Sequence, residues 1–470
     1  MRVDARDREI AELKDQVRDL ILVVERQAAR ITELEARLNS DSSTSSKPPS
    51  SDGLTKRRSV PRQRGVRPPG KQPGTDGRFL SQVTAPDVVV EHEPHSCGSC
   101  GSSLIGAPLM QTETRQVADL PPIELVWTEH RSRRRRCSCG HVTAGVFPED
   151  VTAPAQYGPN LKSAAAYLCS YQHVPFARAA EAFRDLLGAD VSVGWLYEHT
   201  ARVAIATLPS VELIADAIAD SAVAHFDETG ARVDGVTRWV HVASTESLTH
   251  LALNDRRGQA AMHEHGILPR FTGLAVHDGL HAYRVFEQAT HVLCNAHHLR
   301  ELAGMVEHFD QPWAQDMIDL LLEIKDHADH ARATGNEPVG SADQRRFRHY
   351  YDEIIADGHF ANPPPPKTGQ RGRPKLAPAG RLVHRLDRDR NQVLRFMTDP
   401  RVPFDNNQAE RDVRNIKVRQ KVSGCWRTVP GAERYMALRS YIDTCRKNQI
   451  NIMTALRAAI DGCPWQPTPA

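Results

Sequence analysis

The sequence predicts a mixed α/β protein with an N-terminal coiled coil, a small zinc-binding module and a helical region ahead of an α/β core. Three observations lead to this fold class. Apolar residues recur every seven positions near the N-terminus, four cysteines fall in two close pairs, and strand-length apolar runs follow residue 220. Because the pattern changes at each boundary, we expect separate structural units along the chain.

The composition fits a globular protein of several domains. The 470 residues are 40% hydrophobic and 25% charged, and the length is enough for roughly three domains. The net charge of +2 says little about partners, so local clusters of Arg and Lys are more informative. No apolar run reaches the ~18 residues of a membrane span, and the N-terminus lacks an apolar signal region. We therefore expect a cytoplasmic protein that does not enter a membrane.

Residues 8–39 predict a coiled coil. β-Branched residues and leucines fill alternate core positions over four heptads, with Gln27 as the one polar member: Ile10, Leu13, Val17, Leu20, Val24, Ile31, Leu34 and Leu38. This choice of side chains favours two parallel strands, so we expect a homodimer or a higher oligomer. The alternative is a single amphipathic helix packed on its own domain.

Residues 40–84 predict a basic disordered linker. Ser, Pro, Gly and cations cannot bury a core. Its seven cations would screen phosphates without reading a base sequence: Lys56, Arg57, Arg58, Arg62, Arg64, Arg67 and Lys71.

Residues 85–150 predict a zinc-binding module. Cys97 and Cys100 form a knuckle-like pair, and Cys137 and Cys139 form a tighter one, so His141 is an alternative to one of the four thiolates. Four such ligands suit a structural Zn²⁺ that stabilises a segment with little core. The alternative is ordinary free or buried thiols.

An arginine run, RSRRRR, precedes the second cysteine pair. We expect Arg134 and Arg135 to contact DNA, and the alternative is a solvated basic strand.

Residues 151–220 follow as a helical region, with a turn at Gly188 and a helix capped by Ser192. This region predicts either a DNA-binding helix-turn-helix or an ordinary helical hairpin.

Residues 221–420 predict the α/β core. The apolar run 222–226 ends in Asp227, and the run 274–277 ends in Asp278, so both aspartates are expected at strand ends. Strands are also expected near 238–244 and 248–254, and a strand at 291–294 leads into a helix. A carboxylate at a strand end is both exposed and rigidly held, as a metal ligand must be.

A helical and Pro-rich insertion is expected at about residues 301–395. Its RGRP stretch resembles a minor-groove hook in which Arg371 and Arg373 would contact DNA, and the alternative is an exposed tip. After the core, residues 421–470 are again helical and are expected to pack on it.

The segment 403–420 is expected to start a helix near Asn406 or Asn407, which puts Glu410 in the first turn. Cations that follow on this helix are candidates for DNA binding: Arg411, Arg414 and Lys417. The two asparagines are candidates either for positioning Glu410 or for binding DNA backbone, and a purely structural turn is the alternative. A solvated, salt-bridged surface helix is the plain alternative for the whole segment.

Asp227, Asp278 and Glu410 form the candidate catalytic triad. Three carboxylates repel one another unless divalent cations hold them, and oxygen ligands favour Mg²⁺ or Mn²⁺. Two such ions activate an attacking oxygen and stabilise a leaving one. Glu228 and Asp405 are alternative ligands.

Two further residues, Cys294 and His297, each have a functional and a structural interpretation. His297 either orients a phosphate or a carboxylate, or is a structural histidine. Cys294 and His297 are a weaker candidate zinc pair, because no two further ligands lie near them in the sequence.

A set of motifs spread over nearly the whole chain resembles the bacterial transposases of insertion-sequence family sixty-six. In chain order the motifs are NSDSSTSSKPPSSDG, CGSCGSSL with CSCGH, QYGPNLKSAAAYL, HFDETGARVDG, HDGLHAY, CNAHHLREL and DNNQAERDVRNIK. Three features depart from the family pattern: Asn295 follows Cys294 where an aromatic residue is usual, the second cysteine pair is CxC, and the stretch 360–380 is more Pro-rich and basic than expected.

The resemblance implies a DDE transposase with an RNase H-like core, in which Asp227, Asp278 and Glu410 are catalytic. It implies nicking at transposon ends, attack of the freed 3′-hydroxyls on target DNA, and a place at the bacterial nucleoid. Two alternatives remain at this point. One is a catalytically silent, transposase-derived DNA-binding protein, and the other is an RNase H-like nuclease that cuts DNA without joining it.

Overall fold

The computed structural model describes residues 2–41, 44–45, 80–335, 337–365 and 375–468, with only the backbone of residues 2–8, 26 and 29. The seven linker cations between Lys56 and Lys71 lie outside this part of the chain, as do Arg371 and Arg373 of the predicted hook. Among the described residues, no helix is long and apolar enough to cross a membrane.

The core is built on a five-stranded sheet of order β5-β4-β3-β6-β7. Its strands are β3 Val223–Val233, β4 Val236–Ser244, β5 Thr249–Asn254, β6 Leu274–His277 and β7 Thr290–Leu293. β3, β4 and β5 form an antiparallel meander, β6 pairs in parallel with β3, and β7 pairs in parallel with β6. β4, β5, β6 and β7 lie close to their predicted positions, whereas β3 continues beyond its predicted end at residue 226.

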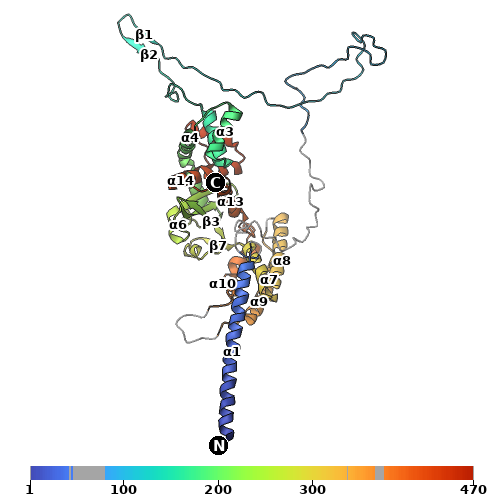
Figure 1. Ribbon diagram of the computed structural model, residues 1–470, viewed down its shortest axis with the longest axis vertical. Coiled ribbons are helices and arrows are strands. Elements are labelled where there is room, and N and C mark those ends of the chain that lie inside the picture. Colours follow the sequence, from blue (N-terminus) through green and yellow to red (C-terminus); the bar gives the residue numbers. More distant parts are fainter. Residues whose placement is uncertain (1, 42–43, 46–79, 336, 366–374, 469–470) are drawn as a thin grey trace.

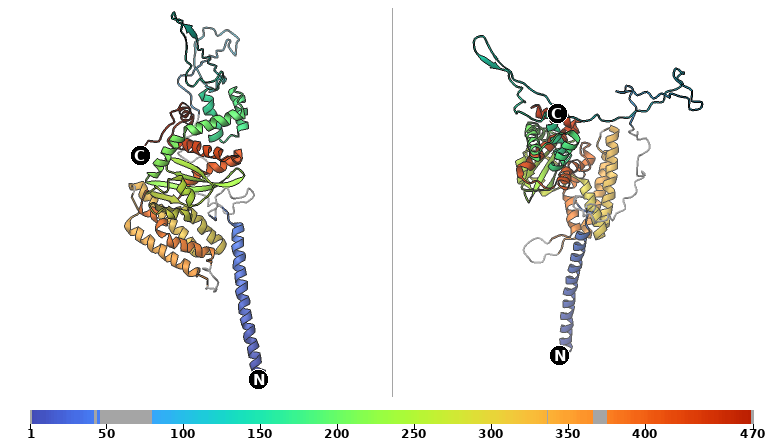
Figure 2. Two further views of the ribbon diagram at one scale, coloured as in Figure 1. Left: turned by 90° about the vertical axis from the view of Figure 1, so that its left-hand side faces the viewer. Right: turned by 45° about the horizontal axis from the view of Figure 1, so that its top comes forward.

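Helices cover both faces of the sheet (Figures 1 and 2). On one face, α13 Asn407–Ser423 and α14 Val429–Lys447 bury a cluster that includes Val233, Val240 and Ile416. On the other face, α5 Leu208–Ala219, α6 Gln259–His265 and the 3₁₀ helix η3 His281–Val285 enclose the aromatic side chain of Phe226. Because side chains alternate along a strand, these two clusters fix which residues of β3 face α13.

A helical subassembly packs on β6 and β7 at the edge of the sheet. It contains α7 Asn295–Phe309, α8 Pro312–Gly335, α9 Ser341–Ala361, α10 Pro378–Arg388, α11 Arg390–Val393 and α12 Arg395–Thr398. These helices lie where the sequence predicts a helical and Pro-rich insertion. Its apolar residues form one continuous cluster with Val276 and Leu293, which anchors the insertion firmly on the sheet.

The helical region before the sheet contains α2 Pro159–Ala166, the π-helical turn η2 Tyr167–Tyr171, α3 Phe176–Leu187 and α4 Val193–Ala206. The predicted turn is confirmed: Gly188 ends α3 with φ 64°, a conformation that favours glycine, and the Ser192 hydroxyl accepts the Trp195 N–H at 3.1 Å. Within the C-terminal region, α14 packs on the sheet, as expected, whereas α15 Ile452–Ile460 packs with α2, α4 and α14 instead of the sheet.

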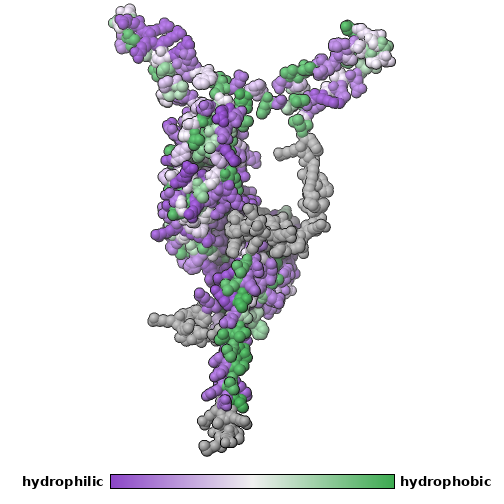
Figure 3. All heavy atoms as spheres, viewed as in Figure 1, coloured by the Kyte–Doolittle hydropathy of each residue, from purple (hydrophilic) through white to green (hydrophobic). Residues whose placement is uncertain are grey.

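The N-terminal helix α1 Arg2–Asn39 projects away from the rest of the chain as a long rod (Figures 1 and 2). Its apolar heptad residues are exposed, and Figure 3 shows hydrophobic side chains following the rod. The segment after it returns to the core, where the buried Thr44 lies against α7. A Cβ on Gly304 would lie 2.2 Å from the Thr44 carbonyl oxygen, so glycine is required for this close approach.

Candidate active site and metal centres

Asp227 lies in the middle of β3, which corrects the expectation of a strand end. The strand continues because residues 229–233 pair with residues 236–240 of β4. Ala231 and Val233 pack against α13, so strand alternation directs Asp227 to the same face. The half-buried carboxylate accepts the Glu228 N–H at 2.8 Å.

Asp278 directly follows β6, as predicted. The parallel pairing of β6 with β3 aligns Val276 with His225, and this places the two aspartates on neighbouring strands. The Asp278 carboxylate accepts the Leu280 N–H at 2.8 Å, and its other oxygen lies 3.7 Å from the Arg257 guanidinium. The side chain is 24% exposed, which leaves it accessible to a ligand.

Glu410 lies in the first turn of α13, as predicted. One of its carboxylate oxygens accepts a hydrogen bond from Arg300 Nη2 at 3.1 Å and lies 3.6 Å from His297 Nδ1. Both neighbours come from α7, so α7 and α13 together position the glutamate.

Asn406 ties α13 to the strand that carries Asp227. Its side chain is 1% exposed, donates to the Phe226 carbonyl at 2.8 Å and bonds His225 Nδ1 at 2.9 Å. Its backbone N–H donates to Cys294 Sγ at 3.0 Å, just after β7. The asparagine therefore fixes the N-terminus of α13 against β3 and β7. By contrast, Asn407 is exposed, and its backbone N–H and side-chain amide both donate to the Asp405 carboxylate.

The carboxylates interact electrostatically in the folded protein. Burial, Glu228, Asp278 and Glu410 together raise the pKa of Asp227 well above its usual range. The negative charges of the neighbouring carboxylates therefore disfavour ionisation of Asp227. A bound cation would remove the repulsion, and an all-oxygen donor set is the kind that Mg²⁺ and Mn²⁺ prefer.

The oxygens of the three predicted ligands do not all lie within a single ion's coordination shell. In the described part of the chain, one group of His, Cys, Asp and Glu ligand atoms has all its members within 4.8 Å of one another: Cys294, His297 and Glu410. Two ions about 4 Å apart with bonds of about 2 Å span oxygens up to about 8 Å apart. A pair of ions therefore tolerates ligand oxygens that lie farther apart than a single ion does.

Glu228 points to the opposite side of β3 from Asp227, as strand alternation requires. It is buried, accepts the Tyr283 hydroxyl at 2.7 Å and pairs with Arg257 at 2.8 Å. Burial and the nearby Asp278 raise its pKa to about 7, against the effect of Arg257. Since both its oxygens are already bonded, Glu228 supports the site and holds Arg257 beside Asp278.

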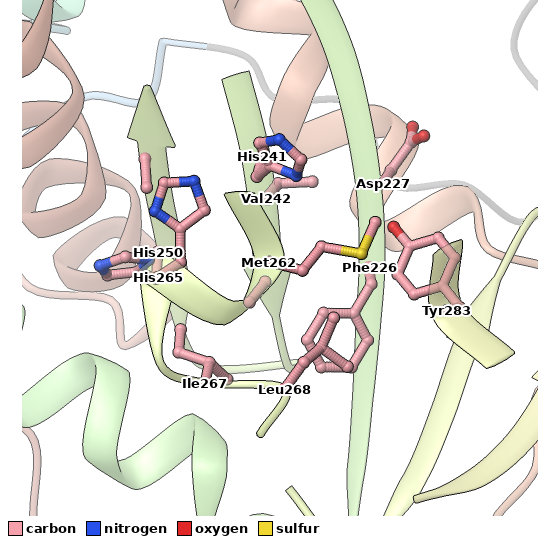
Figure 4. A pocket seen from close by; sticks show the side chains of 12 residues that line it. Phe226, Asp227, His241, Val242, His250, Met262, His265, Ile267, Leu268 and Tyr283 are labelled. Carbon is pink, nitrogen blue, oxygen red and sulfur yellow. The ribbon is translucent and has the colours of Figure 1, made fainter. Parts of the chain in front are cut away.

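A small cavity of about 30 Å³ lies under this part of the sheet. Figure 4 shows Asp227 and Tyr283 at one end of it, and His241, His250 and His265 on the other side. The Asp227 carboxylate points away from the apolar floor formed by residues such as Phe226 and Met262 (Figure 4). The cavity has room for a water-sized group only, so a large substrate must approach from outside it.

The cations of α13 differ in exposure. Arg411 and Arg414 are exposed, as expected of DNA contacts. Lys417 is half-buried and donates to the Gly230 carbonyl of β3, so it braces the helix against the sheet. This contact gives Lys417 a structural role that the sequence-based expectation of DNA binding missed.

A polar cleft of about 630 Å³ opens beside the first turns of α13. It is lined by residues of η2, α13 and α14 that include Arg411, Asn415 and Arg446. Arg439 and Lys447 at its base are held in buried ion pairs with Asp443 and Asp412 at 2.7 Å. The cleft therefore joins the helical region to the helix that carries Glu410.

The two predicted zinc-ligand pairs lie on separate extended arms (Figure 1). Cys97 and Cys100 lie in one turn, in which the Cys97 carbonyl accepts the Gly101 N–H at 2.9 Å. Cys137 and Cys139 lie in the turn of the hairpin formed by β1 Arg134–Arg136 and β2 Val142–Ala144, with Gly140 at φ 91°. Each pair is folded as a tight turn, and the structure does not bring the four thiols together.

Hydrogen bonds from neighbouring groups lower the thiol pKa in both turns. The Ser102 hydroxyl and the Cys97 thiol lower the pKa of Cys100 to about 7, and Cys139 lowers that of Cys137. Thiolates are the form that binds zinc, so each turn fits half of a tetrahedral site. The His141 carbonyl accepts the Cys137 N–H at 2.8 Å, which closes the second turn.

The fold and the site define a mixed α/β protein with an acidic centre between arginines and a separate module bearing paired cysteines. The family described as Transposase IS66 family matches residues 154–434, which is more than half of the chain. The chain therefore belongs to the IS66 transposase family.

Two further matches cover the N-terminal part. The zinc-finger binding domain of transposase IS66 matches residues 94–140, which contain all four paired cysteines. A family of unknown function (DUF6444) matches residues 3–80, which span α1 and the predicted linker. No curated protein matches the chain. The resemblance seen in the sequence motifs is thus confirmed at the level of the family.

Sequence reasoning missed three residues of the site: Arg257, Tyr283 and Arg300. Arg300 lies in the CNAHHLREL motif, and Tyr283 in HDGLHAY, so the motifs did contain a signal. Arg257 follows β5 and reaches the site only through the fold, where it stacks 5.0 Å from the Trp239 ring centre.

Proposed function

We propose that this transposase cleaves and joins DNA through a site in which Asp227, Asp278 and Glu410 bind two Mg²⁺ or Mn²⁺ ions. The arrangement of the three elements supports the proposal: Asp227 lies on β3, Asp278 directly follows the neighbouring strand β6, and Glu410 lies in the first turn of α13, which packs on the Asp227 face of the sheet. When bound, such ions activate the attacking oxygen and stabilise the leaving 3′-oxygen. The reaction at transposon ends is hydrolysis of a phosphodiester, followed by attack of the freed 3′-hydroxyl on target DNA.

We further propose that the core is RNase H-like. The supporting observation is the strand order β5-β4-β3-β6-β7, with an antiparallel meander followed by two parallel strands. One acid on β3, one after β6 and one on a helix packed over the sheet suit such a core. The proposed domain is residues 221–420, with the insertion at about 301–395.

Two arginines would assist the acids of the site. Arg257 and Arg300 lie beside Asp278 and Glu410, respectively. Both guanidiniums are partly exposed, at 40% and 20% for the side chain. They are therefore placed to bind non-bridging phosphate oxygens while the acids hold the ions.

DNA would be bound along a path outside the acids. The polar cleft connects the helical region 151–220 with Arg411 on α13, and Arg134 and Arg135 are exposed on the hairpin arm. We propose that these groups contact the phosphates of transposon ends, which orients the DNA without specifying its bases. Arg414 would extend the contact along α13.

The cysteine module would hold one structural Zn²⁺ through Cys97, Cys100, Cys137 and Cys139. The match to the zinc-finger region and the lowered thiol pKa values in both turns support this ligand set. Zinc would require the two arms to approach each other, and the module is proposed to span residues 85–150.

Self-association would occur through α1, whose apolar heptad residues are exposed along the rod. Replacing Leu20 by Lys should convert the oligomer to a monomer, because a charge in the seam opposes burial. Light scattering coupled to gel filtration measures the mass, and Glu12→Lys is the control that adds the same residue off the stripe. An unchanged mass for the Leu20→Lys protein would refute the proposal.

The catalytic proposal is tested with DNA that carries the inverted repeats flanking the gene. Wild-type protein should nick this DNA in Mg²⁺ and join pre-cut ends to a second duplex, whereas Glu410→Gln should do neither. Glu433→Gln changes an exposed glutamate of α14 and serves as the matched control. Nicking without joining would indicate a nuclease, and binding without nicking would indicate a silent DNA-binding protein.

A further inference from the structure

The described part of the chain contains a second group of metal ligands that shares Glu410. A thiol, an imidazole and a carboxylate converge from two helices: Cys294 precedes α7, His297 lies in its first turn, and Glu410 lies in the first turn of α13. Their ligand atoms all lie within 4.8 Å of one another. Bonds of about 2.0–2.3 Å in a tetrahedral zinc site separate ligand atoms by about 3.3–3.8 Å, so small side-chain movements would complete the site.

The ligand atoms are held in place but remain partly unsatisfied. His297 Nδ1 is buried and has no hydrogen-bond partner in the described structure. Cys294 is 1% exposed, and its sulfur accepts the Asn406 N–H at 3.0 Å, a bond that orients the sulfur without using the thiol proton. Glu410 has one oxygen bonded to Arg300, and its side chain is 20% exposed. A buried nitrogen without a partner costs free energy that a metal bond would recover.

The chemistry of this donor set differs from that of the acidic site. Thiolate and imidazole ligands favour Zn²⁺ or Co²⁺, whereas Mg²⁺ and Mn²⁺ prefer oxygen. We propose that Cys294, His297 and Glu410 form a three-ligand site for a thiophilic divalent ion such as Zn²⁺. The ion would replace the thiol proton of Cys294, which passes to solvent, and would leave a fourth position open.

Occupancy of this site would regulate the proposed reaction, and this part of the inference rests on the proposed function. In the described part of the chain, a Glu410 oxygen lies within 4.8 Å of the Cys294 and His297 ligand atoms but is not grouped in this way with Asp227 and Asp278. Zn²⁺ bound by the thiol and the imidazole would therefore draw Glu410 away from the catalytic ions. The expected result is inhibition of Mg²⁺-dependent cleavage by Zn²⁺.

Metal binding is tested first, without reference to activity. Metal-free full-length protein is titrated with Co²⁺, and thiolate-to-cobalt absorption and bound equivalents are measured. Wild-type protein should bind one thiolate-ligated equivalent more than Cys294→Ser or His297→Gln. Loss of one ligand should weaken this binding by at least about 10–100-fold, the effect known for outer-sphere partners. Cys445→Ser, a change at another buried cysteine, should bind like wild type.

The cysteine module is separated from this site by a further variant. The double variant Cys97→Ser, Cys100→Ser should lose the Co²⁺ equivalent that the cysteine module binds. It should keep the Co²⁺ equivalent that depends on Cys294. Circular dichroism and thermal unfolding establish that each variant is folded. If the Cys294→Ser protein does not fold, the comparison is made with the His297→Gln protein alone. Equal cobalt binding by wild type and a folded His297→Gln protein would overturn the site.

Inhibition is then measured as the ratio of cleavage rates with and without Zn²⁺ within each protein. Zn²⁺ should lower this ratio about tenfold or more for wild type and for Cys445→Ser, and less for His297→Gln. Cobalt binding without any Mg²⁺-dependent cleavage would refute the proposed function and leave the site standing. Cleavage with no equivalent that depends on Cys294 would refute the site and leave the function standing. Binding with equal inhibition of wild type and His297→Gln would refute the regulatory role.

Discussion

The acidic site and the cysteine arms hold their functional groups by opposite means. Around the acids, the sheet, α7 and α13 bury large apolar clusters, and Asn406 joins three segments through hydrogen bonds. In the arms, the cysteines lie in short turns, and nearly all large apolar side chains between residues 80 and 147 are exposed. The first site is therefore preorganised by packing, whereas the proposed zinc site would need its ligand to bring distant segments together.

Among the changes that test this comparison, removal of a carboxylate from the acidic site should have the largest effect on DNA cleavage. We expect Asp227→Asn to lower the rate of Mg²⁺-dependent cleavage by about 10³-fold or more. The neutral side chain would bind the ions more weakly, and each ~1.4 kcal/mol of lost transition-state stabilisation slows the reaction about tenfold. The fold should persist, since Asn fills the same space. Single-turnover nicking measures the rate, and full activity of the folded variant would remove Asp227 from the site.

A smaller effect is expected at the asparagine that joins α13 to β3. Asn406→Ala removes two side-chain hydrogen bonds and leaves the buried Phe226 carbonyl without a partner. The free energy of unfolding should fall by about 2–3 kcal/mol. Cleavage should fall as Glu410 loses its position, and doubling the Mg²⁺ concentration should not restore it.

Asn407→Ala is the matched control for this change. The neighbouring asparagine is exposed and bonds within its own turn, so its loss should alter stability by less than about 0.5 kcal/mol. Urea unfolding compares the two variants. Equal stability losses would show that Asn406 does not act as a tether.

Acid should weaken the packed region and leave the exposed arms unaffected. Burial lowers the pKa of His173 to about 4, that of His250 to about 4 and that of His265 to about 3. The unfolded chain, with a histidine pKa near 6.5, binds protons first, so stability present above about pH 6.5 is lost as pH falls toward 4. Each histidine should cost up to about 2 kcal/mol at pH 5.

Thermal unfolding at pH 7 and pH 5 measures this loss. His173→Gln should be less sensitive to acid than wild type, because the replaced group no longer titrates. His330→Gln changes an exposed histidine of α8 and should keep the wild-type sensitivity. A pH profile that is identical for all three proteins would contradict a buried neutral His173.

The smallest effect on the core should follow removal of zinc from the arms. Chelation should leave the main thermal transition within about 1 °C, because the arms share little apolar surface with the sheet. Limited proteolysis should instead accelerate at residues 85–150. A large drop in the main transition would show that the module packs on the core when zinc is bound.

The sequence alone determined much of the local structure. The heptads set the length of α1, Gly188 and Ser192 set the turn between α3 and α4, and the DNN segment set the start of α13. These features depend on residues close together in the chain, whose propensities act locally. The motifs likewise indicated the family, because order and spacing are properties of the sequence.

Only the tertiary structure decided how the site is assembled. The continuation of β3 beyond Asp227 depends on pairing with β4. The contacts of Arg257 and Arg300 with the acids depend on the positions of β5 and α7 in the fold. The role of Lys417 also depends on the fold. The sequence predicts a surface cation, but in the structure Lys417 donates a hydrogen bond to the Gly230 carbonyl. Such contacts join residues that are distant along the chain, and neither local propensity nor periodicity records the packing that brings them together.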